Sequence, residues 1–251
     1  MHIRLADDLF IVGGGVINGF GLSTSADCHV YAYRSGDEIL LVDCGMDDDG
    51  GLDAIWSNMR EAGLDAANIS TVAITHYHVD HCGGIGRLLE RVDARVLASE
   101  ETLAAIRVGD TQANAFALAQ RDGFYPAHYR FEAAPDLVAA PVDQPVVVGG
   151  REVTPIPAPG HCAGHRVYST TGEAGRYLFT GDCLFHGGRI SLLNTADCSI
   201  EDYRSTIARL AELEFDALLP GHGALTMSGG MDHVKSAAAA FESLTLPPGM
   251  A

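Results

Sequence analysis

The sequence has no long apolar run and few basic residues. No stretch approaches the about 20 consecutive apolar residues that a transmembrane helix needs, and residues 1–8 lack the basic head and apolar body of a signal peptide. The 16 Lys and Arg residues stand against 33 Asp and Glu, a net charge of −17, which repels nucleic acid and anionic membranes. We therefore expect a cytoplasmic protein that acts on a small-molecule substrate, with no nucleic-acid or membrane partner; homodimer formation stays open.

Cysteine is sparse and shows no pairing motif. The 6 cysteines form no CxxC and none of the framework spacings of disulfide-rich domains. Cys82, Cys162 and Cys183 each directly follow a histidine or aspartate of the motifs described below. Because free cysteine behaves as a small apolar residue, we interpret these residues as filling tight space.

Length and composition indicate one folded α/β unit. The chain has 251 residues, of which 47% are hydrophobic and 20% charged, as is ordinary for a globular protein. Two strand-rich halves, each flanked by helical patterns, lie on either side of residues 108–135, and no repeat or linker separates them. This order predicts a single four-layer domain over residues 1–251.

The densest group of metal-binding side chains follows the apolar run at 71–74. That run is typical of a buried strand, and the turn after it contains His76, His78, Asp80 and His81. Open α/β sheets keep their sites at the carboxyl ends of strands, and imidazole and carboxylate are donors that Zn²⁺ or Fe²⁺ prefers. A solvated polar turn is the alternative, but three later turns favour a metal site.

Those later turns also come directly after predicted strands. They contain His161 with His165, then Asp182, then His222. Asp43 ends another predicted strand, at 38–43, and is a candidate to orient a ligand imidazole. A plain turn aspartate is an equal alternative for Asp43.

Other segments carry weaker signals. We predict a strand at 27–33, a helix at 83–92 beginning beside the metal site, and helical structure at 110–120. The glycine-rich loop at 13–21 is not followed by a helix, so we interpret it as a loop bordering a pocket instead of a dinucleotide-binding motif.

The aromatic segment at 108–135 is either a helical hairpin packed on the core or the wall or lid of a substrate pocket. We predict that it faces residues 186–197 across the metal site and that Tyr125, His128 and Arg189 bind substrate. Tyrosine offers apolar area with a polar tip, and arginine can bind a carboxylate or acyl oxygen with two donors.

Taken together, four motifs resemble the metallo-β-lactamase superfamily, in its order and over the whole chain. They are Thr-His-Tyr-His-Val-Asp-His (75–81), Pro-Gly-His-Cys-Ala-Gly-His (159–165), Thr-Gly-Asp-Cys-Leu-Phe (180–185) and Pro-Gly-His (220–222). The resemblance implies a four-layer αββα sandwich with two divalent metal ions at one edge of the sheets, zinc first and iron or manganese as alternatives. It implies one ion on His76, His78 and His161, the other on Asp80, His81 and His222, and Asp182 with a hydroxide bridging both. His165 falls on a position that is usually structural.

The same resemblance implies a metal-dependent hydrolase. Such a site lowers the pKa of water from about 15.7 towards ~7 and stabilises a developing oxyanion, while Asp80 can take or give a proton beside the attacking water. This chemistry suits an ester, thioester or lactone.

Several subfamilies share these motifs. Residues 181–189 and Tyr203 most resemble glyoxalase II-like hydrolases, and small lactonases of the fold share the ligand set. Residues 223–251 are too few for the helical domain with which glyoxalase II holds glutathione, which argues against hydroxyacylglutathione as the substrate. Lactam cleavage is not expected, because β-lactamases usually lack an aspartate at the position of Asp182. The alternatives are a persulfide dioxygenase with a single iron and a non-enzymatic metal-binding module.

Overall fold

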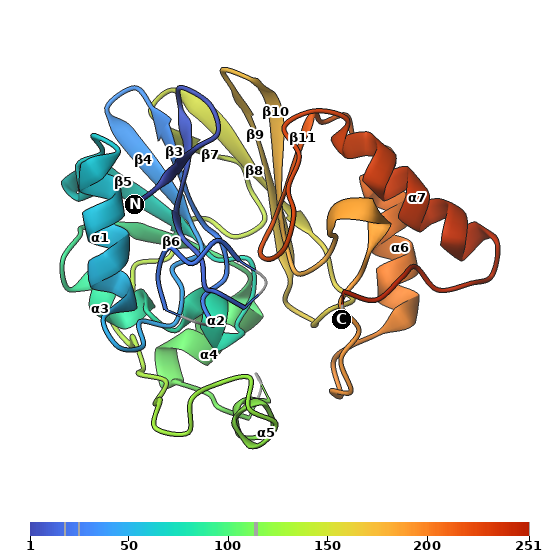
Figure 1. Cartoon of the computed structure of the whole chain (residues 1–251), viewed down its shortest axis with the longest axis horizontal. Coiled ribbons are helices and arrows are strands. Elements are labelled where there is room, and N and C mark those ends of the chain that lie inside the picture. Colours follow the sequence, from blue (N-terminus) through green and yellow to red (C-terminus); the bar gives the residue numbers. More distant parts are fainter. Residues whose placement is uncertain (18, 25, 113–114, 251) are drawn as a thin grey trace.

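Two β-sheets lie face to face, each built from one half of the chain (Figure 1). The computed structural model of the chain describes residues 1–17, 19–24, 26–112 and 115–250. The 6-stranded sheet has the order β1-β2-β3-β4-β5-β6, with β1 Ile3–Arg4, β2 Leu9–Gly13, β3 Val30–Ser35, β4 Glu38–Val42, β5 Ile69–Ala73 and β6 Arg95–Leu97. The 5-stranded sheet has the order β11-β10-β9-β8-β7, with β7 Val146–Val148, β8 Arg151–Pro157, β9 Arg166–Gly172, β10 Gly175–Gly181 and β11 Ala217–Pro220.

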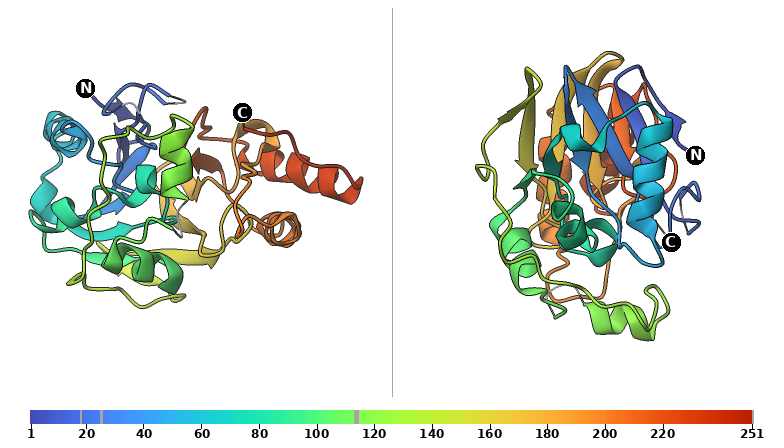
Figure 2. Two further views of the ribbon diagram at one scale, coloured as in Figure 1. Left: turned by 90° about the horizontal axis from the view of Figure 1, so that it is seen from below. Right: turned by 90° about the vertical axis from the view of Figure 1, so that its left-hand side faces the viewer.

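Helices cover the outer face of each sheet (Figure 2). On the first sheet these are α1 Gly51–Glu61, α2 Val79–Cys82, α3 Ile85–Leu89 and α4 Glu100–Val108, with the short 3₁₀ helix η1 Ala66–Asn68. The short helix α5 Phe116–Arg121 lies apart from the sheet, at the bottom of Figure 1. On the second they are α6 Ile200–Leu210 and α7 Gly230–Glu242, with η2 His186–Gly188 nearby. The predicted αββα sandwich is confirmed. No helix within the described ranges is long and apolar enough to cross a membrane.

The alternation of side chains along each strand produces separate layers of core. In β3, Val30 and Ala32 pack towards the helices, whereas Tyr31 and Tyr33 pack between the sheets. Successive strand side chains point to opposite faces, so a strand in the middle of the sandwich is apolar on both. This is why the central strands appear in the sequence as continuous apolar runs.

The strand directions bring several strand ends to one edge. β4 runs parallel to β5, and β10 runs parallel to β11. β8 and β10 are both antiparallel to β9, so they share a direction. The turns after β4, β5, β8, β10 and β11 carry the predicted site residues, and their convergence follows from this topology.

Three predicted boundaries differ from the structure. The strand predicted at 27–33 begins only at Val30, because the N–H groups of Cys28 and His29 donate to Asp80 O (3.2 Å) and Gly221 O (2.6 Å) instead of a neighbouring strand. The helix predicted at 83–92 is shorter in the structure, α3 Ile85–Leu89, and a separate single turn of helix, α2, precedes it at Val79–Cys82. Helical structure predicted at 110–120 is found at Phe116–Arg121; residues 113 and 114 lie outside the described part of the chain.

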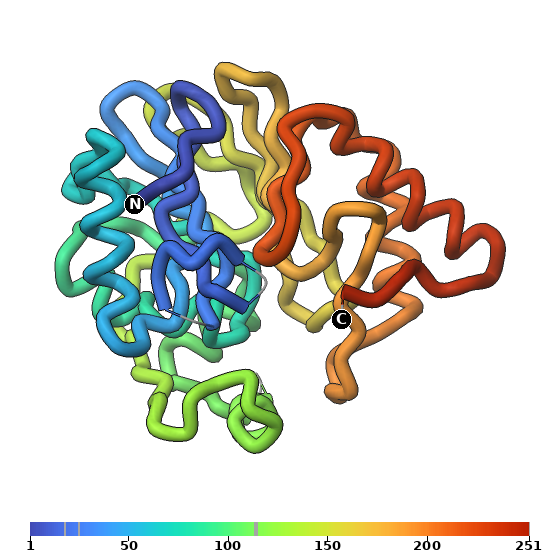
Figure 3. The backbone as a smooth tube through the Cα atoms, in the orientation of Figure 1, coloured from blue at the N-terminus to red at the C-terminus, as the bar shows by residue number. Residues whose placement is uncertain are grey.

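The 108–135 segment both packs on the core and reaches the site. Phe116, Tyr129 and Phe131 are buried in the core beneath the first sheet, whereas Phe124 is exposed. The Tyr129 hydroxyl donates to Met46 O at 2.5 Å. In the backbone trace the segment, in green, and the loop around residue 195, in orange, both lie at the lower side of the molecule (Figure 3).

Candidate metal centre

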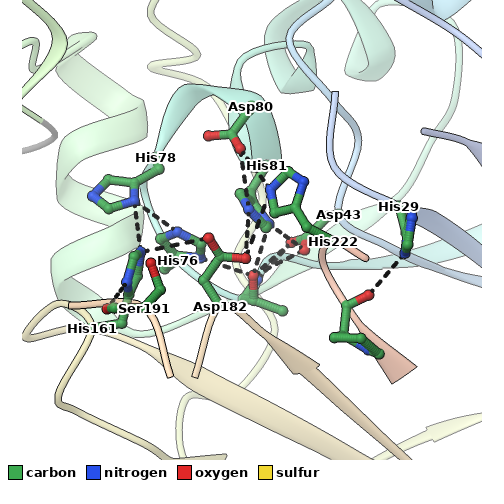
Figure 4. Close-up of polar contacts among 12 residues, drawn as sticks. His29, Asp43, His76, His78, Asp80, His81, His161, Asp182, Ser191 and His222 are labelled. Atoms are coloured by element: carbon green, nitrogen blue, oxygen red, sulfur yellow. Dashed lines mark hydrogen bonds and ion pairs between the residues drawn. The ribbon is translucent and has the colours of Figure 1, made fainter. Parts of the chain in front are cut away.

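Two groups of three side chains converge at the shared edge of the sheets (Figure 4). In the first triad (His76, His78 and His161), the Nδ1 atom of His78 lies 2.9 Å from His76 Nε2 and 3.0 Å from His161 Nε2. In the second triad (Asp80, His81 and His222), Asp80 Oδ2 lies 3.0 Å from His222 Nε2 and 3.4 Å from His81 Nε2. Residues from the turns after β5, β8 and β11 therefore meet as the sequence predicts.

Asp182, directly after β10, lies between the two triads (Figure 4). Its Oδ1 atom is 3.3 Å from His81 Nε2 and 3.8 Å from His222 Nε2, both in the second triad. Its Oδ2 atom is 3.8 Å from His161 Nε2 in the first. One carboxylate therefore faces both triads, with one oxygen towards each.

Hydrogen bonds at the opposite ring nitrogen fix which nitrogen of His161 and of His81 faces the centre. His161 Nδ1–H donates to the Ser191 carbonyl at 2.9 Å, and His81 Nδ1–H donates to Asp43 Oδ2 at 2.8 Å. Because both acceptors lack a proton, each Nδ1 keeps its own, and Nε2 is the atom that faces the centre and is available to a cation. This is the usual way in which a protein orients metal-binding histidines.

Asp43 anchors both triads. Its carboxylate accepts from the N–H of Thr75 at 2.8 Å and from the Thr75 hydroxyl at 2.9 Å, as well as from His81. Since the Thr75 hydroxyl donates its proton to Asp43, the hydroxyl oxygen is left to accept from His76 Nδ1–H, at 3.0 Å. Of the two interpretations that the sequence leaves open, the structure shows the orienting one.

The donor atoms fit divalent cations. His81 Nε2 and Asp182 Oδ1 are buried and have no hydrogen-bond partner among the described residues. In the first triad, three imidazole nitrogens face one another at about 3 Å, an arrangement in which the lone pairs repel unless a proton or a cation lies among them. Burial, reinforced by neighbouring histidines, lowers the pKa of His76 and lowers that of His78 to about 3, so both are neutral and able to ligate.

The second triad has the opposite charge balance. Burial would lower the pKa of His81 and of His222, but nearby acidic groups, Asp182 among them, raise both. Burial would likewise raise the pKa of Asp182, yet His222 and His81 hold it well below its usual range. Asp80 and Asp182 are therefore ionised, as oxygen ligands of a cation must be.

Gly221 lets the last turn pass close to the centre. A Cβ atom at this position would lie 2.6 Å from His81 Cε1 and 2.8 Å from Asp182 Oδ1. Such distances are shorter than any real van der Waals contact, so only glycine fits between Pro220 and His222.

Comparison with known proteins agrees with this geometry. The family model described as "Metallo-beta-lactamase superfamily" matches residues 24–222. The chain belongs to the metallo-beta-lactamase superfamily. A solved metallo-beta-lactamase from Cronobacter sakazakii superposes with a TM-score of 0.71 and 22% identity, over 97% of each chain; at this identity the likeness shows the fold.

Two curated relatives match most of this chain, but the match covers only part of their own sequences. A hydroxyacylglutathione hydrolase from Chromohalobacter salexigens is 26% identical over 206 residues, 78% of this chain and 62% of its own length. An atrochrysone carboxyl ACP thioesterase from Aspergillus fumigatus is 26% identical over 200 residues, 78% of this chain and 51% of its own length. This chain is thus similar to metal-dependent hydrolases of the superfamily and spans between half and two thirds of these relatives.

Within this superfamily site, His165 and Tyr203 contact the chain around Asp182. The backbone N–H of Asp182 donates to His165 Nε2 at 3.2 Å, which matches the structural position that the resemblance implies. The Tyr203 hydroxyl donates towards Asp182 O (3.1 Å) and Ser191 O (3.0 Å). Both residues therefore hold the backbone that carries the central carboxylate and the acceptor for His161.

The residues predicted to bind substrate lie in different places. The Tyr125 hydroxyl donates to Asp80 Oδ1 at 2.6 Å, and His128 Nε2 lies 2.9 Å from Asp48 Oδ1. The exposed Arg189 donates to Gly249 O at 2.7 Å, near the end of the chain. Tyr125 thus contacts the second triad directly, His128 lies beside the loop after β4, and contact of these residues with substrate stays a prediction.

His29 is a residue at the centre that the sequence analysis did not identify. Its Nδ1–H donates to Pro220 O at 3.2 Å, its ring stacks on Phe20 at 4.9 Å, and it lies 6.4 Å from the His222 ring. A lone histidine in an apolar run gives no signal of this position, because the contacts that bring it to the centre are with Pro220 and His222, almost the whole chain away.

We expect His29 to make folding sensitive to acid. Burial, followed by the charge of His222, lowers the pKa of His29 from 6.5 to about 4. The unfolded chain therefore takes up a proton near pH 6.5, whereas the folded chain resists until about pH 4. Stability that is present above pH 6.5 is lost as the pH falls towards 4, by on the order of 3 kcal/mol.

His29→Asn should remove the part of this sensitivity that His29 contributes, because the amide keeps a donor for Pro220 O and does not titrate between pH 4 and 6.5. The measurement is Tm of chelator-treated wild-type and variant protein across this pH range, and the variant should show a flatter profile. An equally steep fall in both would assign the acid sensitivity to the other buried histidines.

Proposed function

We propose that this chain is a dinuclear metal-dependent hydrolase that cleaves an activated carboxylic bond, with thioesters favoured over esters and lactones. The observation that carries the proposal is Asp182, whose two oxygens face two separate triads of donors. His76, His78 and His161 would hold one ion and Asp80, His81 and His222 the other, with Asp182 shared between them. Zinc is the first choice for these nitrogen and oxygen donors.

The bound ions would supply Lewis acidity, which lowers the pKa of water and stabilises negative charge on a carbonyl oxygen. The side chains of this protein would orient the histidine ligands and neutralise part of the charge of the cations. Asp43 keeps His81 and, through Thr75, His76 in the tautomer that presents Nε2 to the centre. Asp80 lies at the centre with His222 at 3.0 Å and is placed to accept a proton from the attacking water and return it to the leaving group.

Two observations favour a thioester. The two curated relatives described above match most of this chain. One is named as an ACP thioesterase, and the other as a hydrolase of hydroxyacylglutathione, which is itself a thioester. A thiolate is also a good leaving group, so the reaction depends mainly on activating water, which this centre is suited to do. Because the chain spans only part of each relative, the acyl carrier or thiol is not transferred with the activity.

Exposed apolar side chains on the segments that contact the centre favour an apolar acyl group. Phe20 stacks on His29, beside His222. Phe124 precedes Tyr125, which contacts Asp80. Leu192 and Leu193 follow Ser191, the acceptor for His161. These four side chains are all exposed. Phe20 is placed at the centre by its contact with His29, and the other three belong to segments that contact Asp80 or His161, so we propose that an acyl chain entering the site meets apolar surface.

The proposal predicts about two metal ions per chain in protein purified without chelator, measured by elemental analysis. The same preparation should be assayed against a panel of acyl thioesters, aryl esters and lactones. We expect turnover of thioesters, higher for apolar acyl groups than for charged ones, and loss of activity on chelation that added zinc restores.

Two outcomes would contradict the proposal. A single iron per chain with oxygen consumption on a persulfide substrate would indicate the dioxygenase alternative. Two bound metal ions without turnover of any member of the panel would indicate a metal-binding module.

A further inference from the structure

The Asp80 carboxylate is held at both oxygens, by groups from opposite sides. Oδ2 faces the second triad, at 3.0 Å from His222 Nε2 and 3.4 Å from His81 Nε2. Oδ1 accepts the hydroxyl of Tyr125 at 2.6 Å. Figure 4 shows one Asp80 oxygen towards His81 and the other directed away from the cluster.

We propose that Tyr125 is a positioning residue for the metal centre: its hydroxyl holds Asp80 Oδ1 so that Oδ2 alone is presented to the second metal position. This inference rests on the proposed dinuclear function. A phenol has an ordinary pKa of about 10 and is a donor near neutral pH. A donor on one oxygen opposes rotation of the carboxylate and disfavours binding of a cation through both oxygens.

The segment around Tyr125 is built to keep the hydroxyl in place. Gln120 Nε2 donates to Pro126 O at 2.8 Å and to Tyr129 O at 3.1 Å, which ties α5 to the loop that follows it. The Phe116 and Tyr125 rings stack, with centroids 6.0 Å apart. The position of Tyr125 is therefore set from within the segment.

The segment is in turn attached to the loop after β4. The Tyr129 hydroxyl donates to Met46 O at 2.5 Å, and His128 lies 2.9 Å from the Asp48 carboxylate. These contacts attach the segment beside the site without touching a predicted ligand. They offer a matched comparison, because Tyr129 and Tyr125 are four residues apart and each donates one hydroxyl bond across the same interface.

The experiment compares Tyr125→Phe with Tyr129→Phe, each losing one hydroxyl and keeping its ring. Metal-stripped protein is titrated with zinc by calorimetry, with a chromophoric chelator as competitor, and circular dichroism checks the fold. In the wild type we expect two binding events. Tyr125→Phe should weaken the second event about tenfold and leave the first unchanged, because contacts that only orient a ligand are worth about 10–100-fold in affinity. Tyr129→Phe should leave both events within about twofold.

Cobalt and kinetics give two further readouts. The visible spectrum of cobalt-loaded Tyr125→Phe should change, since the second ion loses its fixed carboxylate geometry, whereas that of Tyr129→Phe should match wild type. With the best substrate of the panel, Tyr125→Phe should lower kcat with KM within about twofold. A residue that contacts only substrate would instead raise KM and leave zinc binding intact.

The outcomes separate this inference from the function on which it rests. A wild-type protein that binds a single ion overturns the dinuclear proposal and the inference with it. Two ions in the wild type with unchanged zinc binding in Tyr125→Phe overturn the inference alone. Equal weakening in both variants would assign the effect to docking of the segment and also overturn it. If Tyr125→Phe does not fold, Tyr125→Met, which keeps apolar bulk, is measured in its place.

Discussion

Replacing Asp182 by asparagine is expected to lower kcat/KM at least ~10²-fold and to weaken metal binding, since even residues that only orient a metal ligand are worth about 10–100-fold. The carboxylate faces His81 at 3.3 Å and His161 at 3.8 Å, one in each triad. Asparagine keeps the shape but removes the negative charge that separates the two proposed cations, and it places an N–H₂ group against one of them. Activity and metal content are measured on the same preparation.

His165→Ala is the matched control for Asp182. His165 accepts the backbone N–H of Asp182 at 3.2 Å and is as deeply buried, but it faces neither triad with a charge. We expect this variant to lose less activity and to retain its metal. If Asp182→Asn kept near-full activity and metal content, the shared position of this carboxylate would have no function.

Much of the centre could be predicted because its metal-binding residue types lie in short sequence motifs. His76, His78, Asp80 and His81 are adjacent in sequence, and they follow an apolar run that is a strand for the ordinary reason that both of its faces are buried. Parallel strands then bring the remaining turns to the same edge. Residue type, position at a strand end and strand direction together suffice to predict that these side chains lie close together.

The partners of these residues could not be predicted in the same way. Ser191 accepts from His161 through its backbone carbonyl, which any residue could supply, so its identity carries no signal. Tyr125 reaches Asp80 across 45 positions of sequence, through a segment whose aromatics could equally have been ordinary core. The need for glycine at position 83 has a similar cause: a Cβ there would lie 2.4 Å from the Tyr129 hydroxyl, a contact set by tertiary packing.

Asp43 is where a change of a single atom should affect both triads. With asparagine, the amide oxygen can still accept from the Thr75 N–H, which leaves the N–H₂ group facing His81 Nδ1–H. Two donors cannot pair, so His81 must move its proton to Nε2, the atom that faces Asp80 and Asp182. The Thr75 hydroxyl also loses its charged acceptor and keeps only the uncharged amide oxygen, at 3.1 Å, which weakens the hydrogen-bond chain that orients His76.

Asp43→Asn should therefore lower kcat/KM and zinc affinity by about 100-fold, at the upper end of the range for residues that orient ligands. Backbone strain does not explain the loss, because Asp43 has a φ of 58° and asparagine tolerates this left-handed conformation well. The control is Asp27→Asn, a buried carboxylate that accepts from Met46 N–H at 2.8 Å and Thr24 N–H at 3.2 Å. That variant should lower Tm but keep zinc affinity within about twofold; equal loss of zinc in both variants would show that destabilisation, and not the tautomer of His81, is responsible.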